Sequence, residues 1–274
     1  MEEIPDFVII GAMKCGTSTL QAQLAIQPGI FMTTPKEPNY FSDDDVFARG
    51  KAWYAGLFAE RQPGDLTGEA STHYTKLPTH PRTLDRMGAR LNSPKLIYLM
   101  RDPLERAISH YIHEWSMGVM GEDPAEEFER HPELTDYSCY GMQLAPYVER
   151  YGREAILLLQ MEDMKSDPQG TLDQVSRFLG REGFQWDPDL GTQNVSAERV
   201  RRLPFHDLIV DNEVATRLRR ALVPKSVRRW IRSSRQMRDR PELPEDLKER
   251  LRVTFSEDQE KLRALFPSDR TISS

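Results

Sequence analysis

The segment from Phe7 to Leu20 constrains the fold of this 274-residue chain more than any other. Its first four residues, Phe7–Ile10, are all apolar, which is typical of a buried strand. A loop with two glycines, one lysine and three hydroxyl groups follows, and the amphipathic sequence after it predicts a helix over 17–27. A strand that leads through such a turn into a helix can bind phosphate, because backbone N–H groups and the helix dipole both face the anion.

This loop differs from the P-loop of nucleotide-hydrolysing proteins, which reads G-x-x-x-x-G-K-[ST]. Gly11 and Gly16 have the required spacing, but Thr17 stands where the lysine would be, and Lys14 lies three residues earlier. The apolar segment 95–100 ends in arginine before aspartate, which leaves no clear Walker-B acid. The alternative is that this segment binds no ligand and is only a glycine-containing turn with a solvated lysine.

Composition indicates a globular enzyme-sized chain rather than a membrane or nucleic-acid-binding protein. With 38% hydrophobic residues, we expect a single domain over 1–274, with a core at 5–180 and a helical, arginine-rich part at about 195–270. The net charge of −6 gives no support for a nucleic-acid partner. No apolar run approaches the ~20 residues of a membrane span, and no signal-peptide core begins the chain, so we expect a cytoplasmic protein. The two cysteines, Cys15 and Cys139, predict neither a disulfide framework nor a zinc site.

Apolar runs alternate with helical patterns along the first two thirds of the chain. Strands are expected at 7–10, 30–32, 65–69, 95–100 and 155–160. Helices are expected near 17–27, 80–91, 104–117, 141–151 and 168–180, with a last one near 244–265. This order predicts an α/β fold with a parallel sheet flanked by helices. Ligands bind beyond the carboxyl ends of such strands. Four charged residues follow these strands and could share one cleft: Lys14, Glu37, Glu69 and Arg101.

A second anion-binding turn is predicted after the strand at 95–100. Pro103 suits the first turn of a helix, and Asp102 is a good N-cap residue. Arg101 then stands just before the helix, where its planar guanidinium can bind a phosphate, and Ser109 follows two turns later. The alternative is that Arg101 and Asp102 only pair with each other. Two such turns in one sheet indicate a ligand that is phosphorylated at two separated points.

A basic segment distinguishes the last third of the chain. Residues 217–240 contain ten lysines and arginines, opposed only by Asp239. Such a run is usually a solvated helix face, although it would also suit an anionic acceptor.

Together these segments resemble the sulfotransferases that use 3'-phosphoadenosine 5'-phosphosulfate (PAPS), in the branch with the heparan sulfate enzymes and many bacterial relatives. Ile9–Leu20 is similar to the family's 5'-phosphosulfate loop, and Lys95–Tyr111 to its 3'-phosphate segment. Lys36–Phe41 resembles the segment that carries the catalytic glutamate. Weaker similarity extends over Tyr140–Glu162 and Phe255–Phe266. The resemblance implies a P-loop NTPase-like sulfotransferase fold with a helical C-terminal part.

The resemblance also implies a reaction and a set of site residues. The reaction is the in-line transfer of a sulfuryl group from PAPS to a hydroxyl or amine of a saccharide or other small-molecule acceptor, without a metal. Glu37 is implied as the base, and Lys14 as the cation that stabilises the leaving group, adenosine 3',5'-bisphosphate (PAP). The implied donor-binding residues are Lys14, Cys15, Gly16, Thr17, Ser18, Thr19, Arg101, Ser109, Arg199 and Arg202.

One departure from the family pattern affects the acceptor side. The segment Glu69–Tyr74 aligns with a family segment that often has lysine after the glutamate, and here Ala70 occupies that place. His73 is a candidate substitute, and Tyr40 is a second candidate for acceptor binding. Two other functions stay open at this point: a P-loop-type nucleotide kinase or NTPase, and a non-catalytic nucleotide-binding module. The sequence reveals neither the acceptor nor the oligomeric state.

Overall fold

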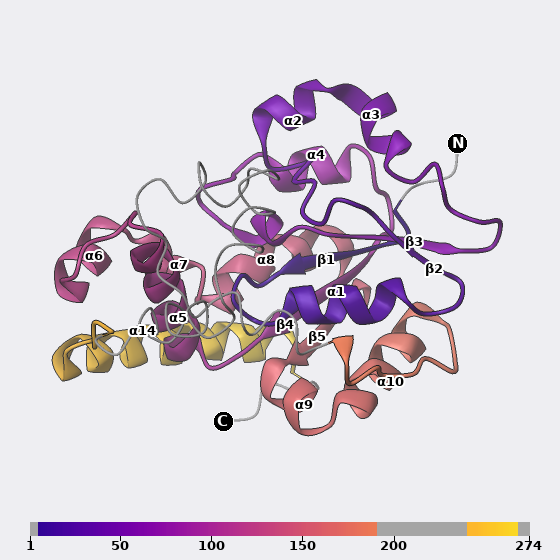
Figure 1. The fold of residues 1–274 in the computed structure, drawn as a ribbon. Coiled ribbons are helices and arrows are strands. Elements are labelled where there is room, and N and C mark those ends of the chain that lie inside the picture. Colours follow the sequence, from indigo (N-terminus) through magenta and orange to yellow (C-terminus); the bar gives the residue numbers. More distant parts are fainter. Residues whose placement is uncertain (1–4, 191–239, 268–274) are drawn as a thin grey trace, which may run out of the picture.

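The computed structural model describes residues 5–190 and 240–267, and a five-stranded parallel sheet forms their centre (Figure 1). The strand order is β2-β3-β1-β4-β5, and every neighbouring pair is parallel. The strands are β1 (Phe7–Gly11), β2 (Ile30–Met32), β3 (Leu66–Ala70), β4 (Lys95–Met100) and β5 (Ile156–Gln160). The predicted parallel α/β sheet is therefore confirmed, with strand bounds within one residue of those expected.

The middle strand explains why this sequence folds as a covered sheet. All five residues of β1 are buried, and Val8 pairs with Glu69 on one side and Leu96 on the other. A strand with apolar side chains on both faces needs a layer of helices on each face. Because the strands are parallel, their carboxyl ends share one edge, and the loops that follow β1, β2, β3 and β4 meet there.

Helices cover both faces of this sheet, as Figure 1 shows. The longer ones near the sheet are α1 (Thr17–Ala25), α8 (Tyr140–Tyr151) and α10 (Pro168–Leu179). Helix α1 is fastened at its far end, because the amide of Gln23 donates to the backbone carbonyl of Asp187 across 2.6 Å.

One predicted helix is shorter than expected, and several short ones were not predicted. Helix α4 spans Thr83–Gly88 rather than 80–91, because Pro81 drives the preceding residue, His80, away from helical backbone angles. Seven short elements have no apolar period long enough to read from sequence: α2 (Asp44–Ala48), α3 (Gly50–Gly56), η1 (Thr72–Thr75), α6 (Pro124–Arg130), α7 (Glu133–Asp136), η2 (Arg153–Ala155) and α9 (Met161–Ser166).

A second, smaller core joins α5 (Pro103–Ser116) to the C-terminal helix α14 (Glu245–Leu265), which is yellow in Figure 1. The apolar side of α14 is buried there, at Leu247, Leu251 and Phe255. Helix α14 also lies along α8, so a segment distant in sequence supports the region near the carboxyl ends of the strands. The arginine-rich segment lies almost wholly outside the described residues.

Candidate active site

The loop after β1 has a backbone that only a few residues can adopt. Gly16 has φ +88°, and a Cβ atom there would lie 2.7 Å from Cε of Met164. Lys14 also has a positive φ, +70°. The N–H of Ala12 donates to the carbonyl of Leu99 across 2.8 Å, which fastens the loop to β4. Gly16 is the N-cap of α1 and provides no side-chain acceptor, so the first N–H groups of the helix are presented as an anion-binding turn.

Cys15 takes part in this loop as a small packed residue. Its side chain is buried, and burial raises the pKa of its thiol to about 11. Because the thiolate is the reactive form, this cysteine is a poor nucleophile near neutral pH.

The turn after β4 is the second predicted anion-binding element. Asp102 caps α5 as predicted, because its carboxylate accepts from the N–H of Glu105 across 2.8 Å. The guanidinium of Arg101 lies 3.5 Å from the carboxylate of Glu105, so it does not pair with Asp102. Nε of Arg101 is buried and has no hydrogen-bond partner among the described residues. A buried, unsatisfied guanidinium N–H is costly, and an anion at this turn would satisfy it.

One tyrosine connects the two turns. The hydroxyl of Tyr140, at the start of α8, donates to the carbonyl of Arg101 across 3.0 Å and lies 3.7 Å from Sγ of Cys15. No role was predicted for Tyr140, although it lies in a segment that resembles the family. A tyrosine 39 residues from Arg101 and 125 from Cys15 cannot be placed between them from local pattern alone.

Glu37 lies after β2, at the same edge of the sheet. Its N–H donates to the carbonyl of Ala70 across 2.9 Å, and its backbone has φ +57°. Its carboxylate accepts from Nζ of Lys36 at 2.7 Å and from Oγ1 of Thr72 at 3.4 Å. Burial favours the neutral acid, but the charge and hydrogen bond of Lys36 outweigh it and lower the pKa of Glu37. Glu37 is therefore ionised at neutral pH, which a general base requires.

His73 lies close to this carboxylate but is not a cation. Its ring stacks on that of His80 at 4.8 Å between centroids. Burial, with the charges of Lys76 and His80, lowers its pKa to about 4. A neutral ring at neutral pH cannot replace the positive charge that Ala70 lacks, so a role of His73 at the acceptor, which stays a prediction, would be that of a neutral hydrogen-bonding group.

Lys76 follows η1 and is a cation near Glu37 that was not predicted from the sequence. Its Nζ lies 5.7 Å from the centroid of the Tyr137 ring. Burial lowers its pKa to about 8, against the opposite effect of the charges of Glu37 and Glu114. The only sequence signal was a lysine in a loop after a predicted strand, which is too common to single out.

Tyr40 and Glu69 form a buried network behind Glu37. The ring of Tyr40 is 1% exposed and stacks on Tyr54 at 4.3 Å. The hydroxyl of Tyr54 donates to the carboxylate of Glu69 across 2.5 Å, and burial raises the pKa of this acid. The expectation that Glu69 shares the cleft is therefore wrong: it lies within β3, is fully buried, and braces the segment that follows Glu37. An acceptor contact of Tyr40 stays a prediction.

The remaining predicted residues divide by position. Thr17, Ser18 and Thr19 form the first turn of α1, and Ser109 lies on α5, beyond Arg101. Arg199 and Arg202 lie outside the described residues.

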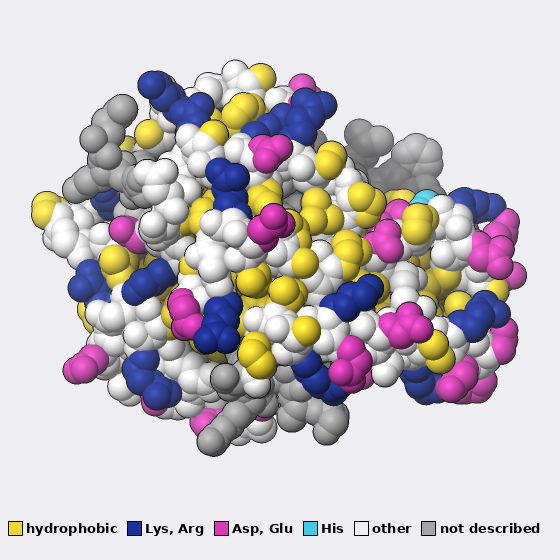
Figure 2. Space-filling view, turned by 180° about the vertical axis from the view of Figure 1, so that it is seen from behind, with side chains coloured by type: hydrophobic (Ala, Val, Ile, Leu, Met, Phe, Trp, Pro, Cys, Tyr) yellow, Lys and Arg dark blue, Asp and Glu magenta, His cyan; other side chains and the backbone are white. Residues whose placement is uncertain are grey.

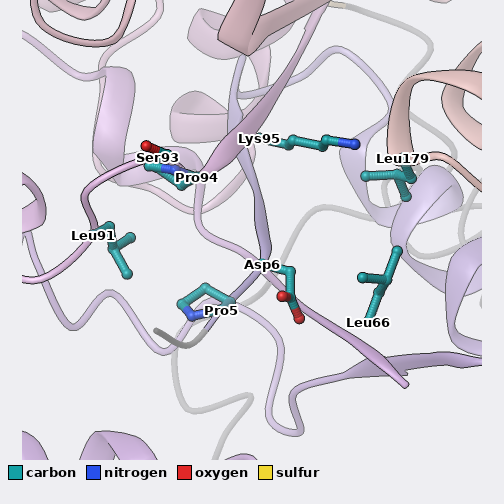
Figure 3. A pocket seen from close by; sticks show the side chains of 8 residues that line it. All are labelled: Pro5, Asp6, Leu66, Leu91, Ser93, Pro94, Lys95 and Leu179. Carbon is teal, nitrogen blue, oxygen red and sulfur yellow. The ribbon is translucent and has the colours of Figure 1, made fainter. Parts of the chain in front are cut away.

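A pocket of about 220 Å³ lies at the opposite edge of the sheet (Figure 3). Most of its residues stand at or before the amino ends of strands, as Asp6 and Lys95 do, and Leu179 is the last residue of α10. Both are already used by the fold: Asp6 accepts from the N–H of Thr67 across 2.7 Å, and Lys95 donates to the carbonyl of Phe178 across 2.7 Å. The chemistry-bearing side chains gather at the carboxyl edge instead, which we take as the candidate active site.

The surface adds no large region of one charge on the side that Figure 2 shows, where acidic and basic side chains are interspersed. Among residues 5–190 and 240–267, no helix has the length and apolar character to cross a membrane.

The parallel sheet, with helices on both faces and the predicted site residues in the turns after the adjacent strands β1 and β4, defines an α/β fold that binds ligands beyond the carboxyl ends of its strands. The family model described as the sulfotransferase domain matches residues 4–264. The chain therefore belongs to the sulfotransferase domain family, and the resemblance noted in the sequence is confirmed.

The curated proteins that this chain resembles in sequence include heparan sulfate enzymes. The chain is 30% identical over 190 residues to heparan sulfate glucosamine 3-O-sulfotransferase 3B1 of Mus musculus, a match that covers 65% of this chain and 47% of that protein. It is 25% identical over 223 residues to bifunctional heparan sulfate N-deacetylase/N-sulfotransferase 4 of Mus musculus, over 69% of this chain and 24% of that protein. The chain spans about half the length, or less, of these curated relatives.

Solved structures agree on the fold. A sulfotransferase from Alicyclobacillus acidocaldarius superposes with a TM-score of 0.68 at 24% identity, covering 97% of this chain and 96% of the other. The sulfotransferase domain of the Synechococcus PCC 7002 olefin synthase gives a TM-score of 0.52 at 15% identity, over 92% and 94%. The predicted sulfotransferase fold is confirmed.

Proposed function

We propose that this protein is a sulfotransferase that moves the sulfuryl group of PAPS to a hydroxyl or amine of a saccharide or other small molecule. The observation that carries this proposal is the pairing of two anion-binding turns, after β1 and β4, with Glu37 at the same sheet edge. The donor has phosphate groups at its 3' and 5' positions, which two separated turns suit. Membership of the sulfotransferase domain family supports the reaction class.

The donor-binding residues fit a nucleotide with these two phosphates. The N–H groups of Gly16 to Ser18, the hydroxyl of Thr19 and the dipole of α1 would hold the 5'-phosphosulfate, with Lys14 beside it. Arg101, with its unsatisfied buried Nε, and Ser109 would hold the 3'-phosphate.

The chemistry follows from the charges of these side chains. Transfer of a sulfuryl group leaves negative charge on the 5'-phosphate of PAP. In this proposal Lys14 stabilises that charge, and such stabilisation accelerates the reaction because it is stronger in the transition state than in the ground state. Glu37 accepts the proton of the attacking hydroxyl or amine, a role worth about 10²–10⁴-fold. The low pKa of Glu37 keeps it in the basic form.

The acceptor is assigned only by class. The names of the curated relatives point to saccharide hydroxyls and amines, since both 3-O- and N-sulfotransferases are among them. A sugar with free hydroxyl or amino groups is therefore the first acceptor to test.

The experiment is an acceptor screen with PAPS that carries radioactive sulfur, run together with ligand-induced thermal shifts. We expect PAP to raise the Tm and label to appear on at least one acceptor class, and we expect Glu37→Gln to abolish labelling while PAP still binds. Stabilisation by ATP and Mg²⁺ alone would instead indicate a kinase or NTPase. Binding of PAP without any transfer would indicate a non-catalytic nucleotide-binding module.

A further inference from the structure

Lys76 stands at the centre of the charged groups beside Glu37. It follows η1 on the connection that leaves β3, and its ammonium faces the ring of Tyr137 at 5.7 Å. Thr72, at the start of the same η1, donates to the carboxylate of Glu37 across 3.4 Å, so η1 lies beside the proposed base. The charge of Lys76 acts on Glu37 after β2, on His73 three residues earlier in the chain, and on His110 of α5. Lys76 therefore lies between the proposed base and the helix that carries Ser109.

Further charged and titratable groups near Lys76 lie on α5. The charge of Glu114 favours the protonated form of Lys76, and the charge of Arg106 opposes it. His110 is 4% exposed, and its Nδ1 has no hydrogen-bond partner among the described residues. Burial lowers the pKa of His110, and the charges of Arg106, Lys76 and Lys14 lower it further. His80 completes the set near Lys76, from the loop before α4.

Two cations lie near the carboxylate of Glu37, and one of them is already used. Nζ of Lys36 donates to Glu37 across 2.7 Å and sets the pKa of this base. Among the described ion pairs none involves Lys76, whose ammonium lies 5.7 Å from the centroid of the Tyr137 ring and interacts with the charges of Glu37 and Glu114. Holding a partly desolvated ammonium without a direct carboxylate partner costs free energy, and an anionic group of a ligand would recover it.

Position 70 cannot supply this charge in the present chain. Ala70 is 1% exposed, and its carbonyl is used by the N–H of Glu37. Lys76 is six residues further along the same connection and directly follows the single turn of η1. Its long side chain can therefore reach back toward the end of β3.

We propose that the ammonium of Lys76 binds the peripheral oxygens of the transferring sulfuryl group and so replaces the cation that position 70 lacks. This inference rests on the proposed sulfuryl transfer. In that step the acceptor oxygen or nitrogen forms a bond to sulfur, the bond from sulfur to the 5'-phosphate oxygen breaks, and its electron pair stays on PAP. The acceptor proton passes to Glu37. Lys14 acts on the leaving oxygen and Lys76 on the sulfuryl oxygens, so neither duplicates the other.

The test compares Lys76→Met and Lys76→Arg with the control Lys51→Met, which removes an exposed lysine of α3. The readouts are kcat and KM for transfer from labelled PAPS, slow sulfate release from PAPS to water without acceptor, and the Kd of PAP. We expect Lys76→Met to lower kcat and sulfate release by about 10²–10³-fold, as loss of a transition-state donor does. The Kd of PAP, which has no sulfuryl group, should change less than about twofold in every variant. Lys76→Arg should recover most of the rate.

The pH profile gives an independent readout. Because Lys76 has a pKa of about 8, its charge is present below that pH and lost above it, so wild-type kcat should fall on the alkaline side. Lys76→Arg should move this limb to higher pH, since guanidinium stays protonated. If Lys76 had only a structural role, Lys76→Arg would leave the alkaline limb of the kcat profile where it is in the wild-type protein.

Three outcomes would overturn the assignment. Lys76→Met with the kcat of Lys51→Met would refute it while leaving the sulfotransferase function intact. Parallel losses of PAP binding and Tm in both Lys76 variants would show a structural role instead. A wild-type protein that binds PAP but transfers no label to acceptor or water would refute the proposed function, and the role of Lys76 with it.

Discussion

The hydroxyl of Tyr140 donates a hydrogen bond to the backbone carbonyl of Arg101 across 3.0 Å, which ties the start of α8 to the turn after β4. The same oxygen lies 3.7 Å from the thiol of Cys15 in the loop after β1. The two proposed phosphate-binding turns are thus held in register by a side chain that belongs to neither. Geometry of this kind matters for a donor with two phosphates, since a displacement of one turn would disturb binding at both.

Tyr140→Phe tests this connection by removing the hydroxyl alone. The loss of one buried hydrogen bond costs about 1 kcal/mol, so we expect a small fall in Tm and a roughly fivefold weaker affinity for PAP. The control is Tyr111→Phe, whose hydroxyl also donates to a backbone carbonyl across 3.0 Å, that of Gly121. The control should lower the Tm by a similar amount and leave the Kd of PAP unchanged in calorimetric titration. Equal effects of both variants on PAP binding would contradict the role of Tyr140.

Gly16→Ala tests the shape of the first loop. The positive φ alone costs an alanine about 1–2 kcal/mol, and the new Cβ would also meet Cε of Met164 at 2.7 Å. Gly29→Ala is the matched control, because Gly29 has φ +72° but open space around its Cβ position. Both variants should unfold at lower urea concentration. Only Gly16→Ala, which distorts the loop proposed to hold the 5'-phosphosulfate, should also weaken PAP binding, by tenfold if the distortion costs about 1.4 kcal/mol. Normal PAP binding by Gly16→Ala would show that this loop does not hold the nucleotide.

The sheet could be predicted from sequence because its strands are short apolar runs. β1, β4 and β5 each bury most of their residues, so nothing but a covered parallel sheet accommodates them. The start of α5 was also predictable, since the Asp102-Pro103 pair is a local signal that the structure uses as such.

The contacts that assemble the site are different, because they join residues far apart in the chain. Tyr54 reaches Glu69 across 15 positions, and Tyr140 reaches Arg101 across 39. Each of these polar side chains has an ordinary local sequence context, so only packing reveals its partner. The same holds for Lys76, whose position in a loop says nothing about which charges it faces.

The Lys36–Glu37 ion pair predicts a defined pH dependence. Since Lys36 lowers the pKa of Glu37, the base stays ionised below the ordinary glutamate value of about 4.3, and activity should persist into that range until unfolding intervenes. Lys36→Met removes the lowering charge and leaves burial to act, so the pKa of Glu37 should rise and the acid limb of kcat should move to higher pH. Lys51→Met is the control, and it should leave the limb in place. The measurement is kcat between about pH 4 and pH 8, with saturating PAPS. An unmoved limb in Lys36→Met would mean that Glu37 is not the group that titrates in the reaction.

Asp258→Asn tests how the C-terminal helix supports the site. The carboxylate of Asp258, on α14, accepts from the N–H groups of Gly141 and Met142 across 2.7 and 2.9 Å, at the start of α8 beside Tyr140. An asparagine can accept with one oxygen only and turns its amide N–H groups toward the second donor, so we expect a loss of about 1–3 kcal/mol in the free energy of unfolding. Asp246→Asn on the exposed side of the same helix is the control and should change stability by less than about 0.5 kcal/mol. Urea unfolding measures the stability of both variants. A calorimetric titration with PAP then shows whether the weaker attachment of α8 in Asp258→Asn also weakens nucleotide binding. If the two variants proved equally stable, the link between α14 and the nucleotide turns would be incidental to the fold.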